Sequence, residues 1–145
     1  MRPRGLGIGL GTCPQRVGYE RRMPMKTDGD AARSKQELDA LTAAFFRAVS
    51  FAEGETPAYT DLPHLFLPSA CLIRNSGATP EMSTLPQFID ARQRKVAAGE
   101  LIRFREIETA ELTEIFGQVA HRFSIYEKEG LDLGTAIAGR GIISM

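Results

Sequence analysis

The chain has 145 residues, 43% of them hydrophobic, which suits one globular domain with one core. Its 18 basic and 18 acidic residues balance, so no overall field favours nucleic acid or an anionic membrane. No run approaches the ~18 consecutive apolar residues of a membrane span, and two cysteines and two histidines are too few for a typical zinc site. We therefore expect a cytoplasmic domain without metal or cofactor.

The first part of the chain is predicted to be an extension. Residues 1–22 are rich in arginine and glycine and poor in large apolar side chains. Such a segment buries too little apolar surface to offset the entropy cost of ordering. We predict that residues 1–33 are a disordered extension or a mis-annotated start, and that residues 34–145 form the domain.

The first helix is predicted to begin at Ser34. Ser34 and Glu37 match the spacing of a capping box, in which each side chain binds a free backbone amide of the other residue. An apolar stripe at helical spacing then continues to about Ser50, and it consists of Leu38, Leu41, Phe45 and Val49. This face must pack against another element.

Three shorter elements follow. Asp61–Phe66 resembles a short helical turn, which Pro68 ends. Ala70–Arg74 is apolar enough for a strand. A second helix is predicted to begin at a cap formed by Ser83 or Thr84 and to end at Gly99.

From Leu101 onward the apolar period changes from 3.6 to 2, which predicts strands. A long strand from Leu101 to Phe116 is expected to be bent or bulged where acidic residues intrude on its apolar face. Gly117 turns the chain into a second strand, and Thr135–Ser144 forms a third in an antiparallel meander. Helices followed by strands are typical of the α+β class.

Two acidic residues of the long strand, Glu106 and Glu108, share one parity and leave two interpretations open. If both are buried, their mutual repulsion raises the pKa of one of them. If the strand leaves the core there, they pair across strands with Arg103, Arg105 or Arg122.

The strand after Gly117 carries a histidine, His121, and alternation separates its side chains into two sets. One set is Val119, His121, Phe123 and Ile125, and the other is Gln118, Arg122, Ser124, Tyr126 and Lys128. Because the first set is largely apolar, we expect it to face the core and to place His121 in a small-molecule pocket. Tyr126 is then expected on the sheet surface or at a dimer face.

Several segments in this order resemble the nuclear transport factor 2-like superfamily, of the SnoaL-like kind, and most of all an uncharacterised branch of it. They are Leu65–Ala70, Phe104–Glu108, Gly117–His121, Ser124–Glu127 and Gly139–Ile142. The resemblance implies a cone-shaped, curved antiparallel sheet packed against N-terminal helices, a cystatin-like roll, with a cavity between them and frequent homodimers. Members usually continue into a further strand, so it also implies that the final strand is missing and the chain truncated.

The resemblance and the apolar pattern together define candidate site residues. The expected pocket is lined by Phe45, Val49, Leu65, Phe66, Phe104 and Phe123. Dehydratases of the superfamily use an acid and histidines around a water, and His121, Asp61 and His64 supply these residue types. Helix capping by Asp61 and surface exposure of His64 are the alternative.

Three functions remain open. The first is a small-molecule-binding domain of unknown ligand, and the second is a cofactor-free lyase or isomerase that uses His121 with Asp61 or a glutamate. The third is a structural or interaction module whose cavity is closed. An open pocket with convergent polar atoms favours chemistry, whereas a filled one favours the interaction module.

Overall fold

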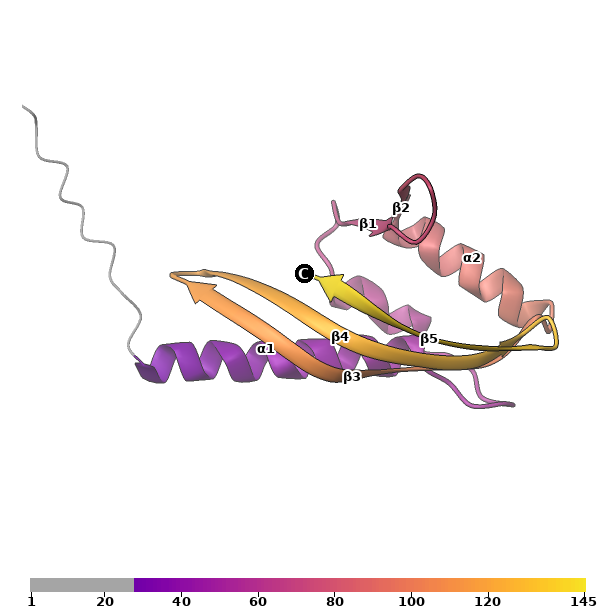
Figure 1. Cartoon of the computed structure of the whole chain (residues 1–145), viewed down its shortest axis with the longest axis horizontal. Helices are drawn as coiled ribbons and strands as arrows, with labels where there is room; N and C mark the ends of the chain where they lie inside the picture. The colour runs from indigo at the N-terminus through magenta and orange to yellow at the C-terminus, as the bar shows by residue number, and fades with distance from the viewer. Residues whose placement is uncertain (1–27) are drawn as a thin grey trace, which may run out of the picture.

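The computed structural model describes residues 28–145, in which helices precede an antiparallel sheet (Figure 1). The elements are α1 (Asp28–Val49), the 3-10 helix η1 (Tyr59–His64), β1 (Cys71–Arg74), β2 (Glu81–Thr84), α2 (Leu85–Ala97), β3 (Leu101–Phe116), β4 (Val119–Asp132) and β5 (Thr135–Ser144). The predicted α+β class is confirmed, and the cone-shaped roll stays a prediction. Within the described range, none of the helices has the length and apolar character needed to cross a membrane.

Helix α1 begins earlier than predicted. It starts at Asp28, so Ser34 lies inside the helix and does not cap it. Ala31, Ala32 and Arg33 are all good helix formers, which explains why the helix extends upstream of the predicted cap. Residues 28–33 are therefore helical, and the rest of the predicted extension, residues 1–27, lies outside the described residues.

Helix α2 begins at the cap that the sequence predicts. The Thr84 hydroxyl accepts a hydrogen bond from the Gln87 amide, and the Gln87 side chain accepts one from the Thr84 amide at 2.8 Å. The two residues satisfy each other's free amides, as in a capping box. Strand β2, which pairs with β1 just before this cap, was not predicted.

The main sheet has the order β3-β4-β5, and all neighbours are antiparallel. Its turns lie at Gly117 (φ +57°) and at Leu133–Gly134 (φ +50° and +74°), where positive φ suits glycine. The register shifts between Glu108 and Ala110, which confirms the predicted bulge in the long strand. The β3–β4 hairpin extends along α1 (Figure 1).

The core consists of two apolar clusters between the helices and the sheet. The first contains Ala48, Val49, Tyr59, Leu62 and Leu85. The second contains Phe51, Leu101 and Phe104, and Phe51 and Phe104 exchange two backbone hydrogen bonds of 2.7 and 3.0 Å. This short bridge fixes the end of α1 to the start of β3. We call the face of the main sheet toward the helices the inner face, and the opposite one the outer face.

Candidate functional site

The alternation of side chains along β4 is confirmed, but the predicted orientation of its two faces is wrong. Arg122 and Ser124 are buried at 2% and 0% relative exposure, on the inner face beneath α1. His121 and Phe123 belong to the exposed outer face. The prediction that His121 faces the core is therefore overturned.

The Arg122 guanidinium can be buried on the inner face because acidic side chains surround it. Arg122 donates to both carboxylate oxygens of Glu108, at 3.1 Å from Nε and 2.6 Å from Nη2. Its Nη1 donates to Asp39 on α1 at 2.7 Å and to the Thr113 hydroxyl at 3.1 Å, and it lies 3.4 Å from Glu111. Bidentate pairing offsets the cost of removing such a charge from water. Of the two interpretations that the sequence left open for Glu106 and Glu108, pairing across strands with Arg122 is confirmed for Glu108 only.

The network extends to the surface through Lys35 of α1. Its ammonium lies 3.0 Å from Asp39 and 3.0 Å from Glu111. Hydrogen bonds from Lys35 and then from Arg122 lower the pKa of Asp39, and those with Thr113 and then Lys35 lower the pKa of Glu111. These carboxylates are therefore ionised at neutral pH and hold the hairpin against α1.

The three candidate catalytic residues do not lie together. His121 Nε2 is 2.7 Å from the Ser144 hydroxyl, and its ring meets Phe123 edge-on at 4.4 Å on the outer face. Asp61 and His64 are exposed on η1, which contacts α1 and α2 but not β4. The combination of His121 with Asp61 and His64 therefore has no geometric basis in this structure.

The predicted pocket residues separate in the same way. Val49 is in the first core cluster, with Phe45, Leu65 and Phe66 packed against it, and Phe104 is in the second cluster. Phe123 is 38% exposed on the outer face and does not share a site with the other five.

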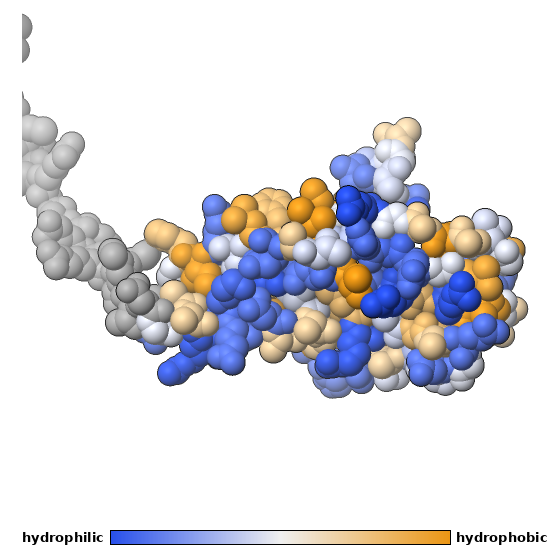
Figure 2. Space-filling view, turned by 60° about the horizontal axis from the view of Figure 1, so that its bottom comes forward, coloured by the Kyte–Doolittle hydropathy of each residue, from blue (hydrophilic) through white to orange (hydrophobic). Residues whose placement is uncertain are grey.

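The outer face of the sheet is exposed and carries seven large apolar side chains as well as charged ones. Its large apolar side chains are Ile107, Leu112, Phe116, Val119, Phe123, Ile125 and Ile142. They form cross-strand neighbours, since Leu112 faces Phe123 and Phe116 faces Val119, and exposure reaches 80% at Phe116. We call this set the outer apolar patch. Figure 2 shows hydrophobic side chains reaching the surface along the length of the molecule.

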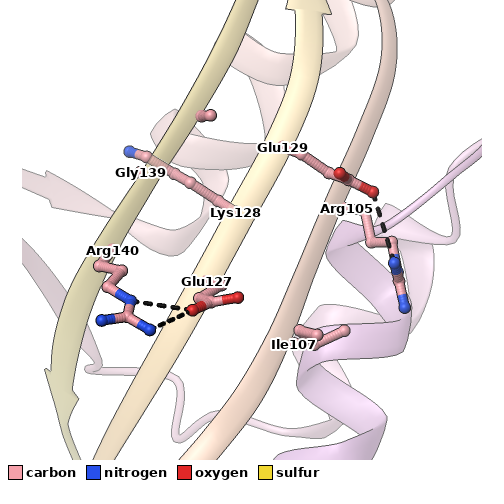
Figure 3. A pocket seen from close by; sticks show the side chains of 8 residues that line it. Arg105, Ile107, Glu127, Lys128, Glu129, Gly139 and Arg140 are labelled. Atoms are coloured by element: carbon pink, nitrogen blue, oxygen red, sulfur yellow. Dashed lines mark hydrogen bonds and ion pairs between the residues drawn. The ribbon is translucent and has the colours of Figure 1, made fainter.

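A charged hollow adjoins the outer apolar patch. It has a volume of about 530 Å³ and is lined by Arg105, Ile107, Glu127, Lys128, Glu129, Ala138, Gly139 and Arg140. Figure 3 shows two ion pairs there, Arg140 with Glu127 at 2.6 Å and Arg105 with Glu129 at 3.4 Å. Each pair joins neighbouring strands, so both acids of this hollow are paired, and Lys128 is a third cation in its lining.

A second hollow, of about 460 Å³, lies between α1 and the edge of β3. Phe46 of α1 and Ser50, which follows α1, line it on one side, and Glu106 and Glu108 line it from β3. The Ser50 hydroxyl accepts a hydrogen bond from the Glu106 amide at 2.9 Å, which fixes the strand edge to the segment just after α1.

Glu106 is the unusual acid of the inner face. Burial raises its pKa, and the nearby cations Arg92 and Lys128 oppose this rise. Desolvation causes this rise in pKa. Repulsion by Glu108 does not, because Glu108 is ion-paired with Arg122. Strand parity identified Glu106, but the sequence did not connect it with Arg92 of α2.

Tyr126 lies on the inner face and not on the sheet surface as predicted. Its ring packs 6.2 Å from that of Phe46, and a Cβ atom at Gly141 would lie 2.5 Å from its ring carbons. The absence of a side chain at Gly141 therefore makes room for Tyr126 across β5.

Comparison with known proteins gives no indication of the function. No protein-family model matches the chain, and no curated protein and no solved structure gives a significant match. The part of the chain that the structure describes also contains no group of three or more metal-ligating side chains.

Replacing Glu106 with glutamine is expected to stabilise the protein at neutral pH. Because burial raises the pKa of Glu106, the folded state holds its proton to higher pH than the unfolded state, and stability falls as pH rises through this range. The gain should disappear well below the ordinary glutamate pKa of about 4.3, where both states are protonated. Urea unfolding at neutral pH and at a pH well below the ordinary glutamate pKa measures this gain in stability.

Glu108→Gln is the matched control for this substitution. It removes the charge that pairs with Arg122, so it should lower stability at neutral pH. A loss of stability at neutral pH in Glu106→Gln as well would show that Glu106 is a stabilising ion-pair partner.

Proposed function

We propose that this domain is an interaction module that associates with a second copy of itself through the outer face of its sheet. The observation that carries the proposal is the outer apolar patch, seven large apolar side chains on one uncovered sheet face. Two antiparallel sheets pack face to face at about 10 Å through such alternating side chains. A two-fold interface needs only one surface, which meets itself.

The size of the patch supports a dimer. Exposed fractions of 60% at Leu112, 70% at Val119 and 67% at Ile142 leave most of these side chains in water. Contiguous apolar patches larger than a few hundred Å² are uncommon on monomers and mark interaction sites, and a standard interface buries roughly 800 Å² per partner.

The charges on the outer face support a second copy as the partner. Arg105 and Arg140 are matched by Glu129 and Glu127 within the same chain. A face with balanced charges meets its own copy without net repulsion. A partner with a net positive or net negative charge gains no electrostatic attraction from such a face.

The inner side supports the same choice among the three functions. Two apolar clusters pack among the helices and against β3, the Arg122 network lies between α1 and the β3–β4 hairpin, and the two hollows described above lie at the outer face and at the β3 edge. The separation of His121 from Asp61 and His64 does not favour the lyase or isomerase.

The proposal agrees with the resemblance noted in the sequence. Helices followed by an antiparallel sheet support a nuclear transport factor 2-like roll, a superfamily in which homodimers are frequent. We include this assignment, and a cytoplasmic location, in the proposal.

Leu112→Lys is expected to abolish the dimer. The substitution places a charge in the centre of the apolar interface, where it would be desolvated without a partner. Sedimentation velocity over a range of protein concentrations should show wild-type dimers and Leu112→Lys monomers.

The matched control is Leu67→Lys, because Leu67 is 76% exposed and lies outside the sheet. This variant should dimerise like the wild type, and circular dichroism should show that both variants are folded. A wild-type protein that stays monomeric at all concentrations, or equal effects of both substitutions, would contradict the proposal.

A further inference from the structure

One edge of the main sheet, along β5, is free over the whole length of the strand. β5 pairs with β4 on one side, and among the described residues it has no strand neighbour on the other side. Of the helices and strands in the described part of the chain, β4 alone contacts β5. A free strand edge presents unpaired amides and carbonyls, which are able to hydrogen-bond to another chain.

The register of β5 shows which residues present these groups. Arg122 and Met145 exchange two backbone hydrogen bonds, of 2.8 and 3.0 Å, so they are a hydrogen-bonded pair of the antiparallel ladder. From Ser144 to Thr135 the register continues without a shift. Because hydrogen-bonded and non-hydrogen-bonded pairs alternate, every second residue of β5 directs its amide and carbonyl away from β4. These outward residues, all exposed, are Ala136, Ala138, Arg140, Ile142 and Ser144.

The features that usually protect an edge strand are absent from β5. Its ten residues contain no proline, its register with β4 has no bulge, and Arg140 is its one charged residue. The Arg140 guanidinium is held by Glu127 of β4, through Nε at 2.8 Å and Nη2 at 2.6 Å. The edge is therefore long and regular, and it is open to a further strand.

An unpaired cation lies at this edge. Lys128 of β4 faces Gly139, where a Cβ atom would lie 3.3 Å from the Lys128 Cε, so the lysine side chain passes over β5. Figure 3 shows it crossing the strand at Gly139. Among the described residues, no carboxylate lies within 4.0 Å of the Lys128 ammonium, and Glu106, its neighbour on β3, interacts with it only at longer range. Lys128 therefore has no ion-pair partner within the described part.

We propose that the free edge of β5 binds an extended peptide with an acidic side chain, which adds to the sheet as a further strand. Hydrogen bonds from the outward backbone groups of β5 hold the peptide main chain, as in β-strand addition. The acidic side chain lies opposite Gly139 and pairs with Lys128. A second copy of this chain fits less well, because it would bring its own Lys128 and Arg140 to the same place.

The site does not depend on the proposed dimer. The outward amides and carbonyls of β5 lie in the plane of the sheet, whereas the outer apolar patch is one of its faces. Leu112→Lys, which should abolish the dimer, should therefore bind the peptide like the wild type.

The probe is a capped eight-residue peptide of alternating threonine and valine with one glutamate near its centre. Fluorescence anisotropy of a dye-labelled form should show saturable binding to the full chain in the millimolar range or tighter. A peptide with glutamine in place of glutamate should bind about twofold to fivefold more weakly, the range for one exposed ion pair. Lys128→Gln should remove this difference between the two peptides.

Hydrogen exchange provides a control within one strand. The peptide should slow exchange of the Ala138 and Arg140 amides, which point outward, and leave unchanged that of the Gly139 and Gly141 amides, which point to β4. Ala138→Pro removes one outward amide and should weaken binding by about tenfold or more. Ala138→Ser keeps this amide and should bind like the wild type.

A peptide methylated at two consecutive central amides tests the site a second time if Ala138→Pro does not fold. The methyl groups block both edges of the peptide, so it should not bind. Absence of saturable binding, equal binding of the methylated peptide, or equal affinity for the glutamate and glutamine peptides would overturn the proposal. Protection of the Ala138 and Arg140 amides that rises with protein concentration, without peptide, would also overturn it and assign the edge to a second copy.

Discussion

Arg122→Leu is expected to lower the free energy of unfolding by about 3 kcal/mol. Arg122 has a 3% exposed side chain and pairs with Glu108 and Asp39. Removing one partner of a buried ion pair costs about 3–5 kcal/mol because the remaining charge stays unpaired. We expect the lower end, because Glu108 and Asp39 are 22% and 46% exposed and water replaces part of the lost contact.

Urea unfolding at one fixed protein concentration measures this loss, since a dimer makes stability depend on concentration. Arg74→Leu is the control, because Arg74 and Glu81 form an exposed pair at 3.7 Å. Such a pair contributes at most about 1 kcal/mol. Equal losses in the two variants would mean that Arg122 is not the centre of the network.

Leu62→Ala is expected to cost about 2–5 kcal/mol, the range for truncating a fully buried leucine. Leu62 lies on η1 at 0% exposure, and its core cluster joins α1, η1 and α2. The loss combines lost apolar burial with the cavity that remains, and urea unfolding measures it. Leu67→Ala, at a position 76% exposed, should stay within about 0.5 kcal/mol of the wild type. Similar effects at both positions would place the core elsewhere.

The elements of the fold were largely predictable because their signals are local. The cap at Thr84, the turn at Gly117 and the strand Thr135–Ser144 follow from neighbouring residues alone, and the structure has them where predicted. Strand β2 was missed because Glu81–Thr84 is polar, and only its pairing with β1 makes it a strand.

The orientation of the sheet could not be predicted from one strand. Alternation separated His121 from Arg122, but hydrophobicity alone assigned the apolar set to the core. The opposite holds because Glu108, Asp39 and Glu111 converge on Arg122 from two other elements. Charge pairing between segments far apart in the sequence therefore decided which face is buried.

The candidate sites were missed for the same reason. The sequence alone did not indicate the surroundings of Arg92, because its stacking on Phe104 depends on how α2 docks on β3. The outer apolar patch follows from the reversed orientation, since it contains the side chains that were expected to form the core.

Cysteine alkylation on the outer face tests the central claim most directly. In a protein with Cys13 and Cys71 replaced by serine, Ile142→Cys places a thiol in the outer apolar patch, and Ala43→Cys places one on the exposed side of α1. We predict that the thiol at position 142 reacts more slowly as the protein concentration rises and dimers form, while the reaction at position 43 does not change. A reaction at position 142 that is independent of protein concentration, in a protein that dimerises, would show that the outer face of the sheet is not the interface.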